Sequence, residues 1–156
     1  MMNVPEQQKQ HLDGWLDGDT HGYCLRVQYE DTDAGGITYH AQYLAFAERA
    51  RSAYLRLLGV DQSTLLAQQG QGFVVRHIAI DYLQAAPYDS LLCIETKLIK
   101  MGGASFKLQQ IINNNAHRHI VARLFVDIVF VTFDENRKTK PEKISKAIRN
   151  KLTLTE

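Results

Sequence analysis

The sequence is poor in cysteine and lacks the short motifs that identify several large classes of enzyme. Its two cysteines, Cys24 and Cys93, lie in apolar segments and do not have a CxxC or zinc-type spacing. We therefore predict that both are reduced and packed as small core residues. The chain also has no Gly-x-Ser-x-Gly elbow, phosphate loop or dinucleotide-binding fingerprint, which argues against a serine hydrolase and against the common nucleotide-binding enzymes.

A strong charge of either sign is also missing. The 156 residues carry a formal net charge of +1 and are 45% hydrophobic. A nearly neutral chain gives no overall electrostatic reason to bind nucleic acid. A chain of this length and composition is expected to bury one core. We therefore predict a single domain that does not bind nucleic acid.

No apolar run is long enough to cross a membrane. The most apolar segment, residues 120–133, is interrupted by Arg123 and Asp127 and is shorter than a spanning helix, so it is predicted to be a buried strand. Residues 1–22 are rich in Gln, Asp, His and Gly and lack the apolar core of a signal peptide. We expect a cytoplasmic protein without a transmembrane segment, with an N-terminal tail over residues 1–22 and one domain over residues 23–152.

Hydrophobic periodicity predicts one long helix and a set of strands. Residues 41–58 have the broad apolar face of an amphipathic helix that Gly59 ends, and Asp61 opens a short helix through Gln69. Segments with strand composition cover residues 25–29, 73–84, 90–101, 104–113 and 119–133. Their short connections make neighbouring strands antiparallel. The sequence thus predicts an α+β fold in which a five-stranded, mostly antiparallel sheet wraps a long central helix.

The most informative segment is residues 27–40, where a glycine turn rich in carboxylates leads into the long helix. Gly35 and Gly36 permit a tight turn with positive φ. The carboxylate of Asp33 is then expected to lie close to the first, unpaired amides of the helix. These amides favour negative charge, either on Asp33 or on an oxygen that becomes negative during a reaction. The segment therefore predicts a catalytic site built around Asp33.

The same segment carries a motif of a known family. The pattern Tyr-x-Asp-Thr-Asp-x-x-Gly begins at Tyr29 and is followed by Tyr43 and by Glu48-Arg49-Ala50-Arg51. It resembles the 4-hydroxybenzoyl-CoA thioesterase-like hotdog proteins, and most closely their Tol-Pal-associated acyl-CoA thioesterase branch. The resemblance covers roughly residues 24–150 and includes residues 72–76, 80–83 and 102–105. It implies a hotdog fold and hydrolysis of an acyl-CoA with a short or aromatic acyl group, without a metal or other cofactor.

In the resembled family, the aspartate at the position of Asp33 carries out the chemistry. It acts either as a nucleophile that forms a mixed anhydride or as a general base that deprotonates water, and both routes are open here. A backbone amide at Tyr39 or His40, at the start of the helix, is expected to stabilise the oxyanion. The side chain of His40 also has two open roles, as a catalytic group or as a helix cap.

Further residues are predicted to bind the substrate. Those at pocket positions near the start of the long helix are Tyr29, Gly36, Tyr39, Tyr43 and Glu48. For Glu48, an ion pair with Arg49, Arg51 or Arg76 is an equally good explanation.

The hairpin at Gly102-Gly103-Ala104 departs from the family. Hydroxybenzoyl-type relatives carry basic residues there for the CoA phosphates, so this mode of binding does not transfer to the chain. Ser105, the backbone of the glycine turn and Lys100 remain the candidates for this role.

Clusters of acids and of histidines raise the alternative of a metal site. Glu30, Asp31 and Asp33 lie within four residues, and hard cations favour clustered oxygens. Alternation along a strand would point neighbouring side chains to different faces, so we expect no metal and interpret Asp31 as a turn or cap residue. His117 and His119 lack a third ligand and are expected to face solvent.

The C-terminal segment is strongly basic. Residues 137–151 contain seven basic residues and one acid. Pro141 is expected to start a helix that turns Ile144 and Ile148 inward. We interpret its outer face as solvated, with CoA phosphates, an acidic acyl carrier protein and an anionic membrane as alternative partners.

Apolar side chains on both faces and at the edges of several strands predict that the sheet needs a partner. We expect a homodimer through sheet edges, or a homotetramer, in agreement with the resembled family. The rival hypothesis is a non-catalytic module that binds an acyl carrier protein or an envelope complex. A hotdog dehydratase would need a catalytic histidine paired with an acid across the interface, and the Asp-Thr-Asp-Ala-Gly-Gly pattern at residues 31–36 argues against it.

Overall fold

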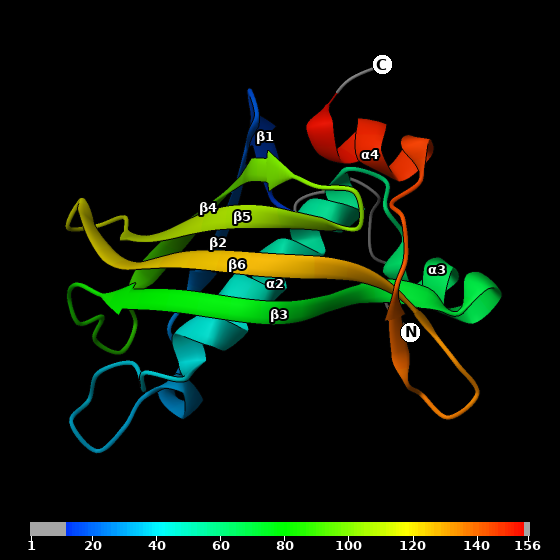
Figure 1. Cartoon of the computed structure of the whole chain (residues 1–156). Helices are drawn as coiled ribbons and strands as arrows, with labels where there is room; N and C mark the ends of the chain where they lie inside the picture. Colours follow the sequence, from blue (N-terminus) through cyan, green and yellow to red (C-terminus); the bar gives the residue numbers. More distant parts are fainter. Residues whose placement is uncertain (1–11, 155–156) are drawn as a thin grey trace, which may run out of the picture.

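A computed structural model describes residues 12–154 and shows an antiparallel sheet of seven strands packed on one long helix (Figure 1). The strand order is β1-β2-β4-β5-β6-β3, and β7 pairs with β6. The strands are β1 (Trp15–Asp17), β2 (Thr20–Arg26), β3 (Gln71–Tyr82), β4 (Leu91–Met101), β5 (Ser105–Asn114), β6 (His119–Phe133) and β7 (Thr139–Pro141). The helices are the 3-10 helix η1 (Tyr29–Asp31), α2 (Gln42–Leu57), α3 (Gln62–Gln69) and α4 (Lys146–Thr153). The predicted α+β arrangement is confirmed, with seven strands where five were expected.

The core lies between α2 and the sheet. On β5 and β6, buried residues alternate with half-buried ones, as expected for strands that have one face on the core. On α2, Phe46, Ala47 and Ala50 are fully buried, and Tyr54 joins them one turn later. Figure 1 shows α2 crossing behind β3 and β6, so that its first turn lies near the C-terminal end of β3.

The predicted helix ends are confirmed by their caps. Gly59, with φ of 72°, directly follows the C-cap of α2. Asp61 is the N-cap of α3, where its Oδ1 accepts a hydrogen bond from the N–H of Thr64 at 3.0 Å, and Gly70 ends the helix with φ of 60°. Within residues 12–154, no helix is long and apolar enough to span a membrane.

The N-terminal part of the sheet differs from the prediction. The strand expected over residues 25–29 is wrong, because β2 covers Thr20–Arg26 and the chain then turns into η1. The indole of Trp15 on β1 lies so close to Gly22 that a Cβ there would be 2.5 Å from it, so a larger residue at this position would require the ring to move. The sheet thus begins ahead of residue 23, where the domain was expected to start. The rest of the predicted tail, residues 1–11, lies outside the described residues.

The C-terminal prediction is wrong in one respect. Pro141 does not start a helix but ends β7, and α4 begins after Ser145, whose Oγ accepts a hydrogen bond from the N–H of Ile148 at 3.3 Å. Two basic side chains of α4 bind carbonyls elsewhere. Arg149 donates to Gly102 O at 2.7 Å, and Lys151 donates to Gly59 O at 2.6 Å. These bonds tie α4 to the β4–β5 hairpin and to the end of α2.

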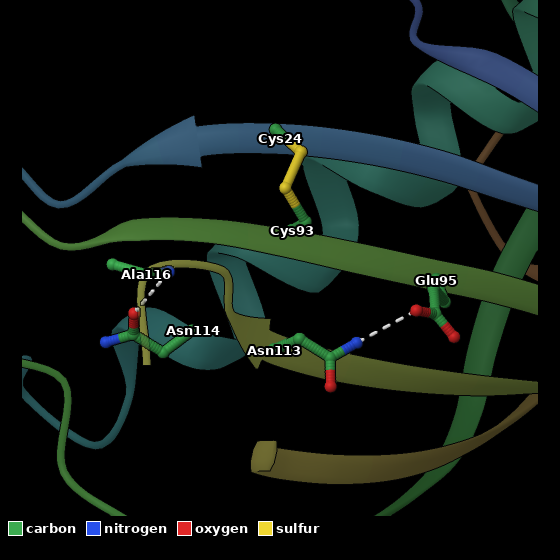
Figure 2. Close-up of a disulfide and its surroundings, with 6 residues drawn as sticks. All are labelled: Cys24, Cys93, Glu95, Asn113, Asn114 and Ala116. Atoms are coloured by element: carbon green, nitrogen blue, oxygen red, sulfur yellow. Dashed lines mark hydrogen bonds between the residues drawn. A yellow bond between two sulfur atoms is a disulfide. The ribbon is translucent and has the colours of Figure 1, made fainter. Parts of the chain in front are cut away.

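The prediction of two reduced cysteines is also wrong. Cys24 on β2 lies directly opposite Cys93 on β4, and the two form a disulfide (Figure 2). Their Cα atoms are 4.1 Å apart on neighbouring antiparallel strands. Both residues are half-buried. The sequence hid this pairing because 69 positions separate the two cysteines, and only the sheet order brings them together.

Candidate active site

The loop that carries Asp33 is held by its own hydrogen bonds. The N–H of Asp33 donates to Ile37 O at 3.0 Å, and the N–H of Gly36 donates to Asp33 O at 3.0 Å. Gly36 has φ of 73°, which favours glycine at this turn. The N–H of Gly35 donates to Asp33 Oδ1 at 2.8 Å and fixes the side chain. The carboxylate is therefore exposed yet ordered.

Asp31 anchors the start of this loop. Its Oδ2 accepts a hydrogen bond from the N–H of Gln28 at 2.7 Å, and only 1% of the residue is exposed. Its carbonyl accepts a hydrogen bond from the N–H of Tyr39 at 2.8 Å. The interpretation of Asp31 as a cap residue is confirmed, because its carboxylate is used to close η1.

A second segment, residues 86–88, clamps the other side of the loop. Both the N–H and the hydroxyl of Thr38 donate to Ala86 O, each at 2.8 Å. The N–H of Tyr88 donates to Gly36 O at 3.3 Å. The turn after β3 therefore sets the position of the Asp33 loop, although it lies about 50 residues further along the chain.

Two pockets lie on either side of the loop. The first, here called the Asp33 cleft, has a volume of about 620 Å³ and is lined by Tyr29, Thr32, Asp33, Ala34, Gly36 and Tyr88. The second, here called the His40 cleft, has a volume of about 280 Å³ and is lined by Ile37, Thr38, His40, Tyr43, Tyr82, Leu83, Gln84 and Ala85. Since Gly36 lines one pocket and Ile37 the other, the loop forms the wall between them.

His40 lies at the start of α2 and offers a free main-chain donor. The N–H of Tyr39 is already bonded to Asp31 O, whereas no acceptor within residues 12–154 takes a hydrogen bond from the N–H of His40. The ring of His40 packs against Tyr39, with centroids 4.4 Å apart, and against the edge of Tyr82 at 6.3 Å. An unbonded amide at the N-terminal end of a helix is suited to stabilise an oxyanion.

Tyr43 forms the inner wall of the His40 cleft. It is buried, and its ring meets that of Tyr82 with centroids 5.7 Å apart. Burial raises the pKa of Tyr43, so its hydroxyl stays protonated at neutral pH. The side chain can therefore act as a neutral hydrogen-bond donor at the wall of this pocket.

Two functional candidates were not identified from the sequence. Tyr82 lines the His40 cleft, and its hydroxyl donates to His40 O at 3.0 Å. Tyr88 lines the Asp33 cleft. Tyr82 stood within a segment that carried the family resemblance, and Tyr88 stood in a predicted turn, but neither signal placed these residues beside the Asp33 loop.

Glu48 does not join either cleft. Its Oε2 accepts a hydrogen bond from Arg51 Nη2 at 2.5 Å, and its Oε1 accepts one from the hydroxyl of Ser52 at 3.0 Å. Arg51 is 5% exposed and also donates to Gln110 Oε1 at 2.9 Å. The structure therefore agrees with the alternative role of Glu48, an ion pair with Arg51. Arg51 in turn joins α2 to Gln110 on β5.

Ser105 lies in a third pocket, at the opposite end of the sheet. This pocket, here called the basic groove, has a volume of about 550 Å³ and is lined by Arg76, His77, Lys100, Gly102, Ser105, Phe106, Lys107, Asp127 and Val129. Asp127 Oδ1 pairs with Lys107 at 3.2 Å. Lys100 forms no ion pair within the described part of the chain, so the groove keeps a free positive charge.

Between residues 12 and 154, no group of three or more His, Cys, Asp or Glu side chains lies close enough together to hold a metal ion. The rings of His117 and His119 stack with centroids 5.9 Å apart.

Comparisons with known proteins identify relatives of the chain. The chain matches a family model, described as the thioesterase-like superfamily, over residues 27–152. It is 52% identical over 93 residues to the acyl-CoA thioesterase YbgC of Haemophilus influenzae, an alignment that covers 60% of this chain and 68% of that protein. It is 40% identical over 124 residues to the acyl-CoA thioester hydrolase YbgC of Escherichia coli, with 80% and 89% covered.

A solved structure supports the fold. The 4-hydroxybenzoyl CoA thioesterase complexed with 4-hydroxybenzoyl CoA superposes with a TM-score of 0.80 and 17% identity, covering 86% of this chain and 99% of that chain. The likeness confirms the hotdog arrangement of helix and sheet.

Proposed function

Because this chain belongs to the thioesterase-like superfamily, we propose that it hydrolyses acyl-CoA thioesters to a carboxylic acid and free CoA at the Asp33 loop. The observation that carries this proposal is an ordered, exposed carboxylate on the same short loop that leads to the unbonded N–H of His40. Thioester hydrolysis requires these two groups, one to attack or to activate water and one to stabilise the oxyanion.

The substrate lies across the loop, with its acyl group in the His40 cleft and its thiol arm in the Asp33 cleft. As a nucleophile, Asp33 attacks the carbonyl carbon, the C–S bond breaks, CoA leaves as a thiolate that takes up a proton, and water hydrolyses the anhydride. As a general base, Asp33 takes a proton from water, whose oxygen attacks the same carbon; the C–S bond then breaks, and the CoA thiolate takes up a proton. In both routes, the N–H of His40 donates to the tetrahedral oxygen.

The His40 cleft is suited to a small acyl group. Its volume of about 280 Å³ and its lining by Ile37, Leu83 and two tyrosines fit a short chain or a single aromatic ring. Free-thiol release from acyl-CoAs of increasing chain length, with benzoyl-CoA and hydroxybenzoyl-CoA included, tests this proposal. Release should be greatest for short or aromatic acyl groups. The absence of release from every member would contradict the proposed activity.

We propose a homodimer that forms through β3. This strand is an edge of the sheet in the single chain, and the apolar side chains of Val75, Tyr82 and Leu83 on or beside it are exposed. Twofold symmetry makes two copies of one strand antiparallel. Such pairing brings the C-terminal end of β3, beside the His40 cleft, next to the N-terminal half of the partner's β3.

Replacement of Val75 by lysine is expected to split this dimer, because a charged side chain on an edge strand opposes strand pairing. Light scattering should give a dimer for the unaltered protein and the 17.8 kDa monomer for Val75→Lys. A monomeric unaltered protein with full thioesterase activity would rule out the proposed assembly.

The basic groove is proposed to bind the CoA phosphates for the partner's cleft. Within one chain it cannot serve its own Asp33, because β4 separates the two by 11 residues, or roughly 36 Å at 3.3 Å per residue. The antiparallel dimer places it at the same end of the sheet as the partner's cleft. Lys100 supplies an unpaired charge there, and Ser105 supplies a hydroxyl.

Lys100→Ala is expected to raise KM for an acyl-CoA by about tenfold, because it removes a charge-assisted hydrogen bond. The KM for the matching acyl-pantetheine, which lacks the nucleotide phosphates, should not change. Lys97→Ala is the matched control, since Lys97 lies on the same strand outside the groove and pairs with Asp19. Equal effects of Lys100→Ala on both substrates would contradict phosphate binding at the groove.

The cytoplasmic location expected from the sequence stays a proposal. Fractionation of cells that contain the protein tests it, and recovery with the envelope would contradict it.

A further inference from the structure

The turn that presents Tyr88 to the Asp33 cleft has an unfavourable backbone conformation. The N–H of Ser90 donates to Pro87 O at 3.2 Å, which closes a four-residue turn with Tyr88 and Asp89 at its centre. Asp89 has φ of 66°, in the left-handed region where glycine is favoured. Aspartate enters this region more readily than most residues but less readily than glycine, so contacts around the turn help to hold it there.

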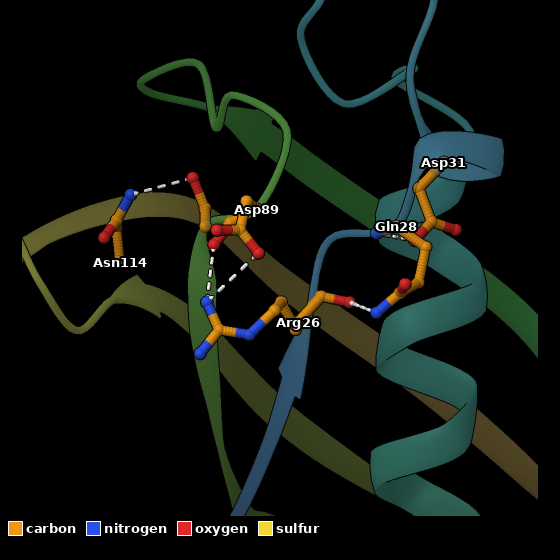
Figure 3. Close-up of polar contacts among 6 residues, drawn as sticks. Arg26, Gln28, Asp31, Asp89 and Asn114 are labelled. Carbon is orange, nitrogen blue, oxygen red and sulfur yellow. Dashed lines mark hydrogen bonds and ion pairs between the residues drawn. The ribbon is translucent and has the colours of Figure 1, made fainter.

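Arg26 provides that support. It is the last residue of β2, and its Nη1 donates to Asp89 O at 2.8 Å and to Asp89 Oδ1 at 3.3 Å (Figure 3). The N–H of Asp89 donates in turn to Val27 O at 3.1 Å. The guanidinium thus binds both the carbonyl and the carboxylate of the strained residue, which fixes the turn on the strand that leads into the Asp33 loop.

This turn places a second aromatic ring at the Asp33 cleft. The rings of Tyr88 and Tyr29 meet edge to face, with centroids 6.5 Å apart and planes at 79°. Tyr29 is 84% exposed and Tyr88 is 56% exposed, although both line the cleft that holds Asp33. Large aromatic side chains held at the mouth of a cleft and left open to solvent are typical of a surface that binds a ligand.

We infer that Tyr88 is a substrate-binding residue that packs, with Tyr29, against the pantetheine arm of the thioester, and that the Arg26–Asp89 pair is its positioning element. The inference rests on the proposed function. In the proposed function the His40 cleft takes the acyl group, so the arm leaves on the Asp33 side of the loop, where these two rings lie. Planar amides, of which pantetheine has two, pack well on aromatic faces. Tyr88 therefore determines how well the thiol side binds, and not which acyl group is accepted.

The test separates the two ends of the substrate. Tyr88→Ala should raise KM for an acyl-CoA by about tenfold with little change in kcat, since the arm is held away from the reacting atoms. Tyr88→Phe, which keeps the ring, should retain the unaltered KM. For an S-ethyl thioester of the same acid, which has no arm, Tyr88→Ala and the unaltered protein should have equal kcat/KM. An unchanged KM for acyl-CoA, or equal losses on both substrates, would overturn the inference.

A binding measurement distinguishes this inference from the proposed function. An unreactive thioether analogue of acyl-CoA can be titrated into each protein by calorimetry. Its Kd should rise about tenfold in Tyr88→Ala, whether or not the protein turns over thioesters. If the Kd values differ as expected but no thioester is hydrolysed, only the proposed thioesterase activity is contradicted. If the Kd is the same in both proteins, the binding role of Tyr88 is contradicted.

The positioning role of Arg26 has its own test. Arg26→Ala should raise KM for acyl-CoA as Tyr88→Ala does, because the strained turn loses its support. Adding Asp89→Gly should return KM to within about twofold of the unaltered value, since glycine adopts positive φ without help. A structural loss unrelated to the turn would not be rescued by this glycine. If Arg26→Ala leaves KM unchanged, or if Asp89→Gly does not restore it, the pair does not position Tyr88.

Discussion

Asp33→Asn is expected to lower kcat for acyl-CoA hydrolysis by about 10³-fold, the range in which positioned acid-base groups contribute. The amide is neutral and can neither attack the thioester efficiently nor take a proton from water. The loop should survive the change, because the Oδ1 of asparagine can still accept the hydrogen bond that Gly35 donates to Asp33 at 2.8 Å. Free-thiol release under saturating substrate, with the melting temperature measured on the same samples, checks both expectations.

Glu30→Gln is the matched control for this experiment. Glu30 is an exposed carboxylate three residues before Asp33, and it lines neither cleft. Its conversion to the amide removes the same charge from the same segment and should leave kcat unchanged. Equal activity of Asp33→Asn and the unaltered protein would remove Asp33 from the mechanism. A similar loss of kcat in Asp33→Asn and Glu30→Gln would show that the negative charge of the segment matters, and not a catalytic role of Asp33.

The same protein can distinguish the two routes of hydrolysis. In a single turnover in H₂¹⁸O, a nucleophilic Asp33 gives its own ¹⁶O to the acid, because water attacks the anhydride at the aspartyl carbon. A general base gives an acid that carries ¹⁸O from water in the first turnover. Release of acid without ¹⁸O in the first turnover, measured by mass spectrometry, would therefore establish the nucleophilic route with attack at the aspartyl carbon.

The long elements of the fold were predictable because their signals are local. The apolar stripe of α2 and the four long strands repeat over many residues, and the predicted bounds agree with the structure to within two residues. The error at residues 25–29 has a local cause that the pattern did not reveal. The carboxylate of Asp31 accepts a hydrogen bond from the N–H of Gln28, and this bond stabilises η1 in a segment with the composition of a strand.

The site was predictable only where it is contiguous in the chain. Asp33, Gly36 and His40 lie on one loop and the helix start that follows it, so a short motif contains them. Tyr82 and Tyr88 reach the same clefts from the far end of β3, and their place depends on the pairing of strands distant in sequence. Ser105 also belongs to a segment that resembles the family, yet it lies at the other end of the sheet and lines neither the Asp33 cleft nor the His40 cleft.

Reduction of the Cys24–Cys93 disulfide is expected to lower the free energy of unfolding by about 4 kcal/mol, the value that chain entropy gives for a loop of this size. The bridge closes a segment of 69 residues that includes α2 and β3. Its cysteines are half-buried, so a small reductant can reach them when the edge of the sheet opens locally. Urea unfolding with and without dithiothreitol measures the difference.

The double variant Cys24→Ser, Cys93→Ser supplies the control, because its stability should equal that of the reduced protein and should not respond to reductant. Activity should persist in both, since β2 and β4 remain joined by the backbone ladder from Thr20 to Arg26, and Arg26 still binds Asp89 in the turn before β4. Titration should find no free thiol in the oxidised protein and two after reduction. Two free thiols before reduction, or equal unfolding curves with and without dithiothreitol, would contradict a stabilising bridge between β2 and β4.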